Sequence, residues 1–193
     1  MSNLSSRKLW AAKLEGGLKT PAGTKEDDSQ RLGARFEGIV LGIDPSLRGT
    51  GIAVVEARGG VWRLLYSITL KHSASLGMAE CLGNIHKSVA AALARFSPAA
   101  VAMEQVIFVQ NSRTALTMGA TRGAAISAAA LAGLPVYEYP PARVKQSVSG
   151  FGRASKEQVA AQVKAILGMA ETLPPDESDA AAVCICHCLT RRA

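Results

Sequence analysis

The stretch GIVLGIDPSLRGTGIAVVEA, residues 38–57, decides the fold that we expect for this chain. Its first part, GIVLGID, is a short apolar run that ends at Asp44, which is typical of a strand buried on both faces. The segment PSLRGTG predicts a tight polar turn, and GIAVVEA at 51–57 predicts a second strand. Because the connection is short, we expect the two strands to pair in antiparallel orientation.

The segments that follow predict the rest of an α/β domain. The turn ARGG leads to a third strand, VWRLLYSITL at 61–70, and AAVAME at 99–104 is another buried strand, which ends at Glu104. Apolar residues at three- and four-residue spacing predict a helix over 75–96. The other expected elements are a helix over 112–132, a strand over 135–139, and helices near 141–148, near 155–168 and from 176. This order predicts a mixed five-stranded sheet with helices on both faces, the ribonuclease H-like arrangement.

Composition and charge limit the possible partners. The chain has 193 residues, and we assign 38–193 to one domain and 1–37 to a flexible N-terminal extension. The net charge of +7 favours a polyanionic partner, nucleic acid before membrane. No apolar run is long enough for a membrane span, and no signal peptide is recognised. We therefore expect a cytoplasmic protein whose four cysteines are reduced.

The acidic residues are the most informative feature of the sequence. Outside the N-terminal extension, aspartate occurs only at Asp44, Asp176 and Asp179. Asp44 ends one buried strand and Glu104 ends another, although Asp44 also suits a turn before proline and Glu104 suits a frayed strand end. Asp176 and Asp179 follow a double proline at the start of a helix, where helix capping is the alternative interpretation.

Taken together, the four carboxylates predict a metal site. Two strand ends and one helix start can converge on a point, and four carboxylates there would repel one another without cations between them. Oxygen ligands without Cys or His suit Mg²⁺ or Mn²⁺. Two such ions can clamp the attacking and leaving oxygens of a phosphoryl displacement.

Four strings of the sequence resemble the RuvC family of Holliday-junction resolvases. They are LGIDPSLRGTGIAVVE, AMEQVIF followed by Asn111, GATRGAAISAAALAGLPVYEYPPARVKQSVSGFGRASKEQV, and PPDESDAAAVCICHC. The strings stand in the family's order, and the resemblance extends from Gly38 to the end of the chain. They depart from its pattern at Ser46, where the family often has glycine.

The resemblance implies a ribonuclease H-like homodimer that makes paired, symmetric cuts in four-way DNA junctions during homologous recombination and repair. It implies two Mg²⁺ ions per active site, which Mn²⁺ can replace, and a branch-migration helicase complex as partner. It carries the catalytic and metal-binding roles onto Asp44, Glu104, Asp176 and Asp179. Lys145 and Lys156 also match and are expected to contact phosphates or to stabilise charge near the cut.

Further DNA contacts are expected outside the carboxylate set. The family has a base-stacking aromatic residue shortly after the glutamate, whereas here Ile107 is third and Phe108 fourth after Glu104. Either the loop shifts to present Phe108, or the stacking is altered. Asn111 and Arg113 open the next helix, where a helix cap is the alternative role for Asn111. Arg143 and Arg153 lie near Lys145 and Lys156 in the sequence, and these four are expected to follow the DNA backbone unless they form an ordinary solvated helix face.

Two other groups of residues have structural interpretations. A zinc site is conceivable at Cys184, Cys186, His187 and Cys188, but on a helix only Cys184 and Cys188 share a face, so we expect buried thiols. The helix over 112–132 has a face of small residues, which favours either a dimer contact or close packing within the chain. Its members are Gly119, Ala120, Gly123, Ala124 and Ser127.

Two competing functions come from other classes of protein. IDPSLRGTG loosely resembles the phosphate loop of actin-like and sugar-kinase ATPases, but that class needs a second loop in a duplicated domain. A protein that binds junctions without cutting them would require a damaged acidic set, and all four acids are present.

Overall fold

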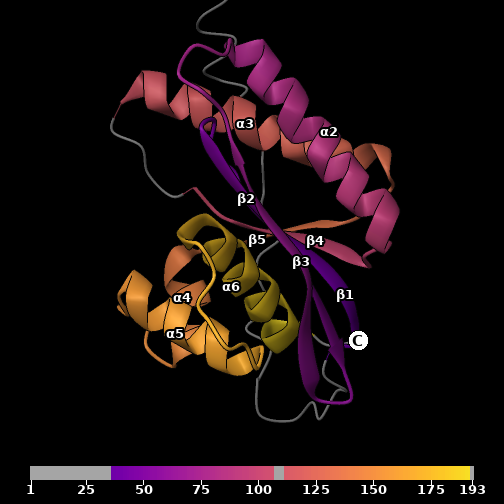
Figure 1. Ribbon diagram of the computed structural model, residues 1–193, viewed down its shortest axis with the longest axis vertical. Coiled ribbons are helices and arrows are strands. Elements are labelled where there is room, and N and C mark those ends of the chain that lie inside the picture. The colour runs from indigo at the N-terminus through magenta and orange to yellow at the C-terminus, as the bar shows by residue number, and fades with distance from the viewer. Residues whose placement is uncertain (1–35, 107–110, 192–193) are drawn as a thin grey trace, which may run out of the picture. The chain divides into compact units, whose positions relative to one another are not determined.

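Five strands form one mixed sheet (Figure 1). The computed structural model describes residues 36–106 and 111–191, so the extension predicted for 1–37 lies almost entirely outside the described residues. The strands are β1 (Gly38–Asp44), β2 (Gly49–Arg58), β3 (Val61–Lys71), β4 (Ala100–Glu104) and β5 (Val136–Tyr139). Their order across the sheet is β3-β2-β1-β4-β5. The first three strands pair antiparallel, whereas β4 is parallel to both β1 and β5.

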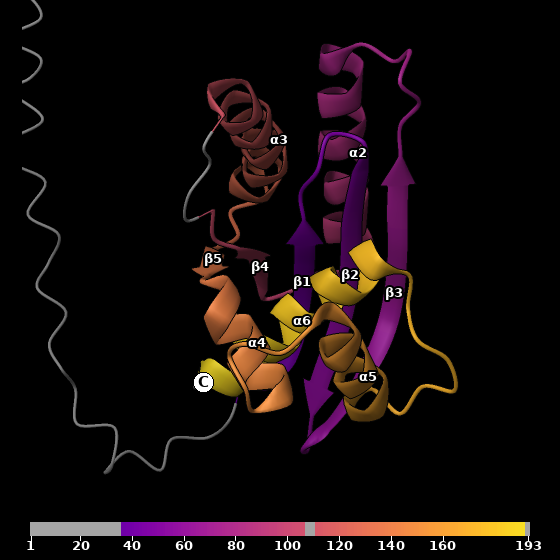
Figure 2. The same cartoon turned by 90° about the vertical axis from the view of Figure 1, so that its left-hand side faces the viewer.

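Helices cover both faces of the sheet, as the sequence predicted (Figure 2). The helices are α2 (Met78–Phe96), α3 (Ser112–Leu131), α4 (Pro141–Ser149), α5 (Lys156–Ile166) and α6 (Pro175–Thr190). The helices α2 and α3 pack against each other and over one face. On the other face α6 lies directly on β1 and β2, and α4 and α5 pack against α6. None of the described helices is long and apolar enough to cross a membrane.

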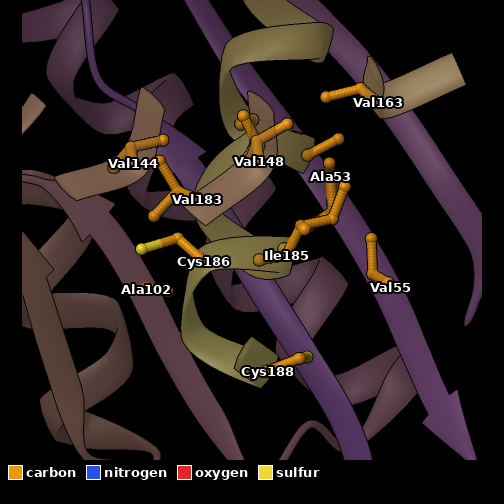
Figure 3. Packing of buried hydrophobic residues seen from close by; sticks show 14 of the residues in the cluster. Ala53, Val55, Ala102, Val144, Val148, Val163, Val183, Ile185, Cys186 and Cys188 are labelled. Carbon is orange, nitrogen blue, oxygen red and sulfur yellow. The ribbon is translucent and has the colours of Figure 1, made fainter. Parts of the chain in front are cut away.

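Alternation along the strands divides the core into two parts. In β2, Ile52 and Val54 belong to the cluster under α2 and α3, whereas Ala53 and Val55 belong to the cluster under α6 (Figure 3). Both parts of the core are buried, so the middle of β2, residues 52–55, is a continuous apolar run. This explains why the sequence shows continuous apolar runs rather than the alternation of a half-exposed sheet.

Glycines allow α6 to approach the sheet closely. A Cβ added at Gly42 would lie 2.1 Å from the carbonyl oxygen of Ala180, and one at Gly51 would lie 1.9 Å from that of Asp176. Cys184 points into the same contact, where its thiol lies 3.5 Å from the carbonyl oxygen of Val40. All three cysteines of α6 are buried and free, which confirms the prediction of core thiols.

Two helix boundaries differ from the prediction. Helix α2 begins at Met78 rather than near 75, because the guanidinium of Arg48 donates hydrogen bonds to carbonyls of the preceding loop, including that of Leu76 at 3.0 Å. Helix α5 ends at Ile166 rather than near 168, since Gly168 has a φ of +63°, outside the helical region. Neither difference moves a predicted site residue.

Candidate active site

The strand register places Asp44 beside Glu104. In the parallel pair β1–β4, Ile43 lies opposite Met103, and the two carboxylates come one residue later on adjacent strands. Ile43 and Met103 belong to the cluster under α2 and α3. Because side chains alternate along a strand, Asp44 and Glu104 point to the opposite face, toward α6.

This register continues across the sheet as a row of residues. Gly51 of β2 lies opposite Asp44, Thr69 of β3 lies opposite Gly51, and Tyr139 of β5 lies opposite Glu104. The row therefore crosses all five strands in the order Thr69, Gly51, Asp44, Glu104, Tyr139. We refer to it below as the acidic row.

The start of α6 brings the other two acids over the acidic row. Pro174 is the N-cap residue and Pro175 is the first residue of the helix, so Asp176 lies in the first turn and Asp179 one turn later. A Cβ added at Gly49 would lie 3.0 Å from Oδ2 of Asp176, which places that carboxylate at the beginning of β2. Asp176 is not the N-cap, but it lies in the first turn of α6, where an acidic residue also interacts favourably with the helix dipole.

Charge and burial together shift the pKa values at this site. Burial, and then the charges of Asp179, Glu104 and Asp176 in that order, raise the pKa of Asp44 from 3.8 to about 7. Burial also raises the pKa of Glu104, followed by the charge of Asp179. The four predicted carboxylates thus influence one another electrostatically, which a scattered set of surface acids would not do.

Two lysines counteract this negative charge. The ammonium of Lys156 donates a hydrogen bond to Oδ2 of Asp179 at 2.8 Å, and this contact is the main reason that the pKa of Lys156 is raised. The charges of Lys156 and Lys145 both act to lower the pKa of Glu104. The lysine side chain at 156 is 73% exposed, so the ion pair is accessible to water and to a ligand.

The acids are close but are not gathered around a single point. In residues 36–106 and 111–191, no three His, Cys, Asp or Glu side chains already form a group that could hold a metal ion. The shifted pKa of Asp44 nevertheless requires the other carboxylates to be near. Lys156 partly explains why the carboxylates do not surround one point, because its ammonium binds an oxygen of Asp179 that a cation would need. The donor set contains only carboxylate oxygens, which fits a hard divalent cation.

Sequence reasoning missed Arg122 of α3. Its guanidinium donates to the backbone carbonyl of Glu104 at 2.5 Å and forms an ion pair with Glu138 at 2.6 Å. These contacts fix the ends of β4 and β5 to α3, and only 11% of the Arg122 side chain is exposed. A usable signal was present, since Arg122 is the one charged residue in the small-residue part of that helix.

The predicted DNA contacts occupy different environments. Asn111 is the N-cap of α3 and accepts a hydrogen bond from the backbone N–H of Arg113 at 2.9 Å, as the capping alternative expected. Arg113 is exposed and lines a pocket together with Asp44. Arg153 is exposed in the turn before α5, and Arg143 is exposed on α4. Burial raises the pKa of the Cys186 thiol on α6, and the charge of Arg143 offsets part of that rise. Ile107 and Phe108 lie outside the described residues.

The small-residue face of α3 is partly open. Gly119 and Gly123 are exposed, and a Cβ added at either would meet nothing within 4 Å. These two glycines are therefore not required for packing within the chain. A dimer contact at this face remains a prediction.

Comparisons with known proteins agree with this geometry. The family model described as "Crossover junction endodeoxyribonuclease RuvC" matches residues 40–187. The RuvC of Solidesulfovibrio magneticus is 42% identical over 156 residues, which cover 81% of this chain and 92% of that protein. The RuvC of Halorhodospira halophila is 44% identical over 154 residues, which cover 80% of this chain and 92% of that protein.

Solved structures show the same fold. The structure of T. thermophilus RuvC in complex with Holliday junction substrate is 40% identical, with a TM-score of 0.75, and the match covers 79% of this chain and 93% of that one. The yeast mitochondrial Holliday junction resolvase Ydc2, at 12% identity and a TM-score of 0.53, shares the fold alone. The ribonuclease H-like prediction is thereby confirmed, and the chain belongs to the RuvC family of crossover junction endodeoxyribonucleases.

Proposed function

We propose that this protein resolves four-way (Holliday) DNA junctions by paired, symmetric nicks in homologous recombination and DNA repair, within the cytoplasm. In this proposal residues 38–193 are the nuclease domain and residues 1–37 an extension to it. The observation that carries the proposal is the acidic row, where Asp44 and Glu104 lie side by side beneath Asp176 and Asp179 of α6. The junction-bound relative supports the choice of substrate, since its RuvC was solved with a Holliday junction.

We assign two Mg²⁺ ions, replaceable by Mn²⁺, to Asp44, Glu104, Asp176 and Asp179. Nucleases of this family depend on metal ions. When bound, such ions lower the pKa of a water and stabilise charge on the attacking and leaving oxygens. The protein contributes a half-buried Asp44 whose pKa is about 7 without cations, so cation binding would favour the ionised form of this carboxylate.

The lysines have a separate role in the proposal. Lys156 holds Asp179 in the structure, and its exposed side chain is free to turn toward a DNA phosphate once cations neutralise the carboxylates. Lys145 lies near enough to Glu104 to influence its pKa, so we assign both lysines to the phosphate beside the cut. Both groups would stabilise negative charge on the reacting phosphate.

DNA binding is assigned to the basic surface around the acidic row. Arg113, Arg143 and Arg153 are exposed and would contact the backbone, so binding should weaken steeply with salt. Asn111 would contribute its amide nitrogen, since its oxygen caps α3. Phe108 is assigned to base stacking, as the family resemblance implies.

Paired cuts need two active sites in fixed relation, which a homodimer supplies. The exposed small-residue face of α3 supports a dimer contact, because Gly119 and Gly123 leave room for a second backbone. The family resemblance also implies a branch-migration helicase complex as partner.

The proposal is tested by incubating a synthetic four-way junction and Mg²⁺ with wild type, Asp44→Asn or Glu104→Gln protein. Wild type should give paired nicks at symmetric positions, and both variants should bind the junction without detectable cutting. Glu171→Gln, which neutralises an exposed acid in the loop before α6, serves as the matched control and should cut like wild type. Cutting by either active-site variant at the wild-type rate would remove that residue from the site.

A further inference from the structure

A third acidic residue of the first turns of α6 has a different environment from its neighbours. Glu177 lies between the proposed metal ligands Asp176 and Asp179 but turns toward β3. Its Oε2 accepts a hydrogen bond from Ser67 Oγ at 2.5 Å, and its Oε1 accepts one from Thr69 Oγ1 at 3.2 Å. Both carboxylate oxygens are therefore held by hydroxyl groups of the sheet.

The sequence of the helix start explains why Glu177 makes this contact. With Pro174 as N-cap, Glu177 occupies the third helical position, from which glutamate usually reaches back to the N-cap N–H. Proline has no N–H, so that partner does not exist. The helix start has no side-chain cap hydrogen bond, and the carboxylate of Glu177 binds β3 instead.

The register shows how the contact crosses the sheet. Thr69 lies opposite Gly51 and Ser67 lies opposite Ala53, so both hydroxyls point to the face that α6 covers. At Gly51 the backbone of Asp176 comes so close that a Cβ would meet its carbonyl oxygen at 1.9 Å. The first turn of α6 thus lies on β2, and Glu177 extends past β2 to bind the next strand.

We propose that Glu177, Ser67 and Thr69 form a clamp that positions Asp176 and Asp179 for metal binding. The need for it follows from charge, because the start of α6 places Asp176 and Asp179 over Asp44 and Glu104, and carboxylates of like charge repel one another. That repulsion pushes the start of α6 away from the acidic row, and the clamp opposes it from the side of β3. Glu177 is a positioning residue and contacts neither cation nor DNA.

The clamp rests on the proposed metal site, and its first test measures metal binding directly. Mn²⁺ affinity of the free protein is measured by the electron paramagnetic resonance signal of unbound Mn²⁺. Residues that hold metal ligands in place typically contribute 10- to 100-fold to affinity, so Glu177→Ala should weaken Mn²⁺ binding by about 10-fold. The Ser67→Ala, Thr69→Val double variant should weaken it equally, since it removes the other half of the clamp.

Glu177→Gln separates positioning from charge. Its amide oxygen still accepts from one hydroxyl and its NH₂ donates to the other, so affinity should return close to the wild-type value. Loss of affinity in Glu177→Gln, combined with wild-type affinity in the Ser67→Ala, Thr69→Val protein, would show that the carboxylate acts by its charge and would overturn the clamp. Wild-type affinity in Glu177→Ala would also overturn it.

A second readout distinguishes the clamp from general stability and from the proposed function. Glu177→Ala should need about 10-fold more Mg²⁺ for half-maximal junction cutting, while its junction binding without Mg²⁺ stays unchanged. Glu171→Ala, a matched loss of an exposed acid, should match wild type in both measurements. If Glu177→Ala lost thermal stability and junction binding as well as Mn²⁺ affinity, the residue would have a general structural role, which would contradict the clamp. Wild type that binds Mn²⁺ without cutting junctions would instead contradict the proposed function, and the affinities would still test the clamp.

Discussion

The two faces of the sheet are built from different kinds of residue. The face toward α2 and α3 carries large, fully buried apolar side chains such as Leu41, Ile43 and Met103. The face toward α6 has glycine at Gly42 and Gly51, so the backbone of α6 comes into direct contact with the strands. All four predicted metal ligands belong to this second face.

This difference lets one face of the sheet form an ordinary hydrophobic core while the other face also positions the acidic residues. Large side chains hold a helix at the ordinary packing distance, whereas glycine lets helix backbone approach the strand. Close approach of α6 brings Asp176 and Asp179 near Asp44. Burial first, and then the charges of the neighbouring carboxylates, raise the pKa of Asp44 to about 7. We therefore expect the stabilisation from the first face to be independent of pH, and the stabilisation from the second face to decrease when its carboxylates ionise without cations.

Replacing Asp44 should have the largest effect on stability. A folded-state pKa raised from 3.8 to about 7 means that the folded state binds the proton more tightly than the unfolded chain does. Without metal ions, the resulting destabilisation is absent below pH 3.8, grows as the pH rises toward 7 and is complete above it. Asp44→Asn should thus stabilise the metal-free protein at pH 8 by up to about 4 kcal/mol.

Urea unfolding in EDTA at pH 5 and pH 8 checks this expectation. The adjacent Ile43→Val change, on the opposite face, is the matched control and should cost about 1 kcal/mol at both pH values. A gain from Asp44→Asn that is as large at pH 5 as at pH 8 would contradict the assignment of the raised pKa.

Gly51→Ala should have an intermediate effect. Its new Cβ would lie 1.9 Å from the Asp176 carbonyl oxygen, so α6 must shift away from β2. We expect a loss of about 1–3 kcal/mol in unfolding free energy, as for other overpacked sites. We also expect about 100-fold slower junction cutting, because small displacements of reacting groups cost that much. Gly83→Ala on α2 would meet nothing within 4 Å and should unfold no earlier than wild type. Equal cutting rates for the two variants would contradict the role given to the close approach of α6 at Gly51.

Removing the lysine of the Lys156–Asp179 ion pair should affect stability least. The side chain of Lys156 is 73% exposed, and exposed ion pairs contribute less than about 1 kcal/mol. Lys156→Gln should therefore shift the urea midpoint only slightly, and high salt should abolish the shift. A shift that persists in high salt would mean that this contact stabilises α6 by packing rather than by charge.

The sequence alone predicted the order of strands and helices and the four acids. GIVLGID and AAVAME are apolar runs that end in a carboxylate, and the double proline marks the start of α6, so local pattern and chain order were sufficient. The exposed lysine at 156 was also found by resemblance before its contact with Asp179 was known.

Only the tertiary structure decided how α6 is held over the acids. The bond between Glu177 and Ser67 joins residues 110 positions apart, and the bond from Arg122 to the Glu104 carbonyl joins a helix to a strand end. The close approach at Gly51 likewise depends on a helix from the other end of the domain. Such contacts leave no periodic signal in the sequence. Each depends on the strand register and on the position of a distant helix, and both are determined only when the whole domain folds.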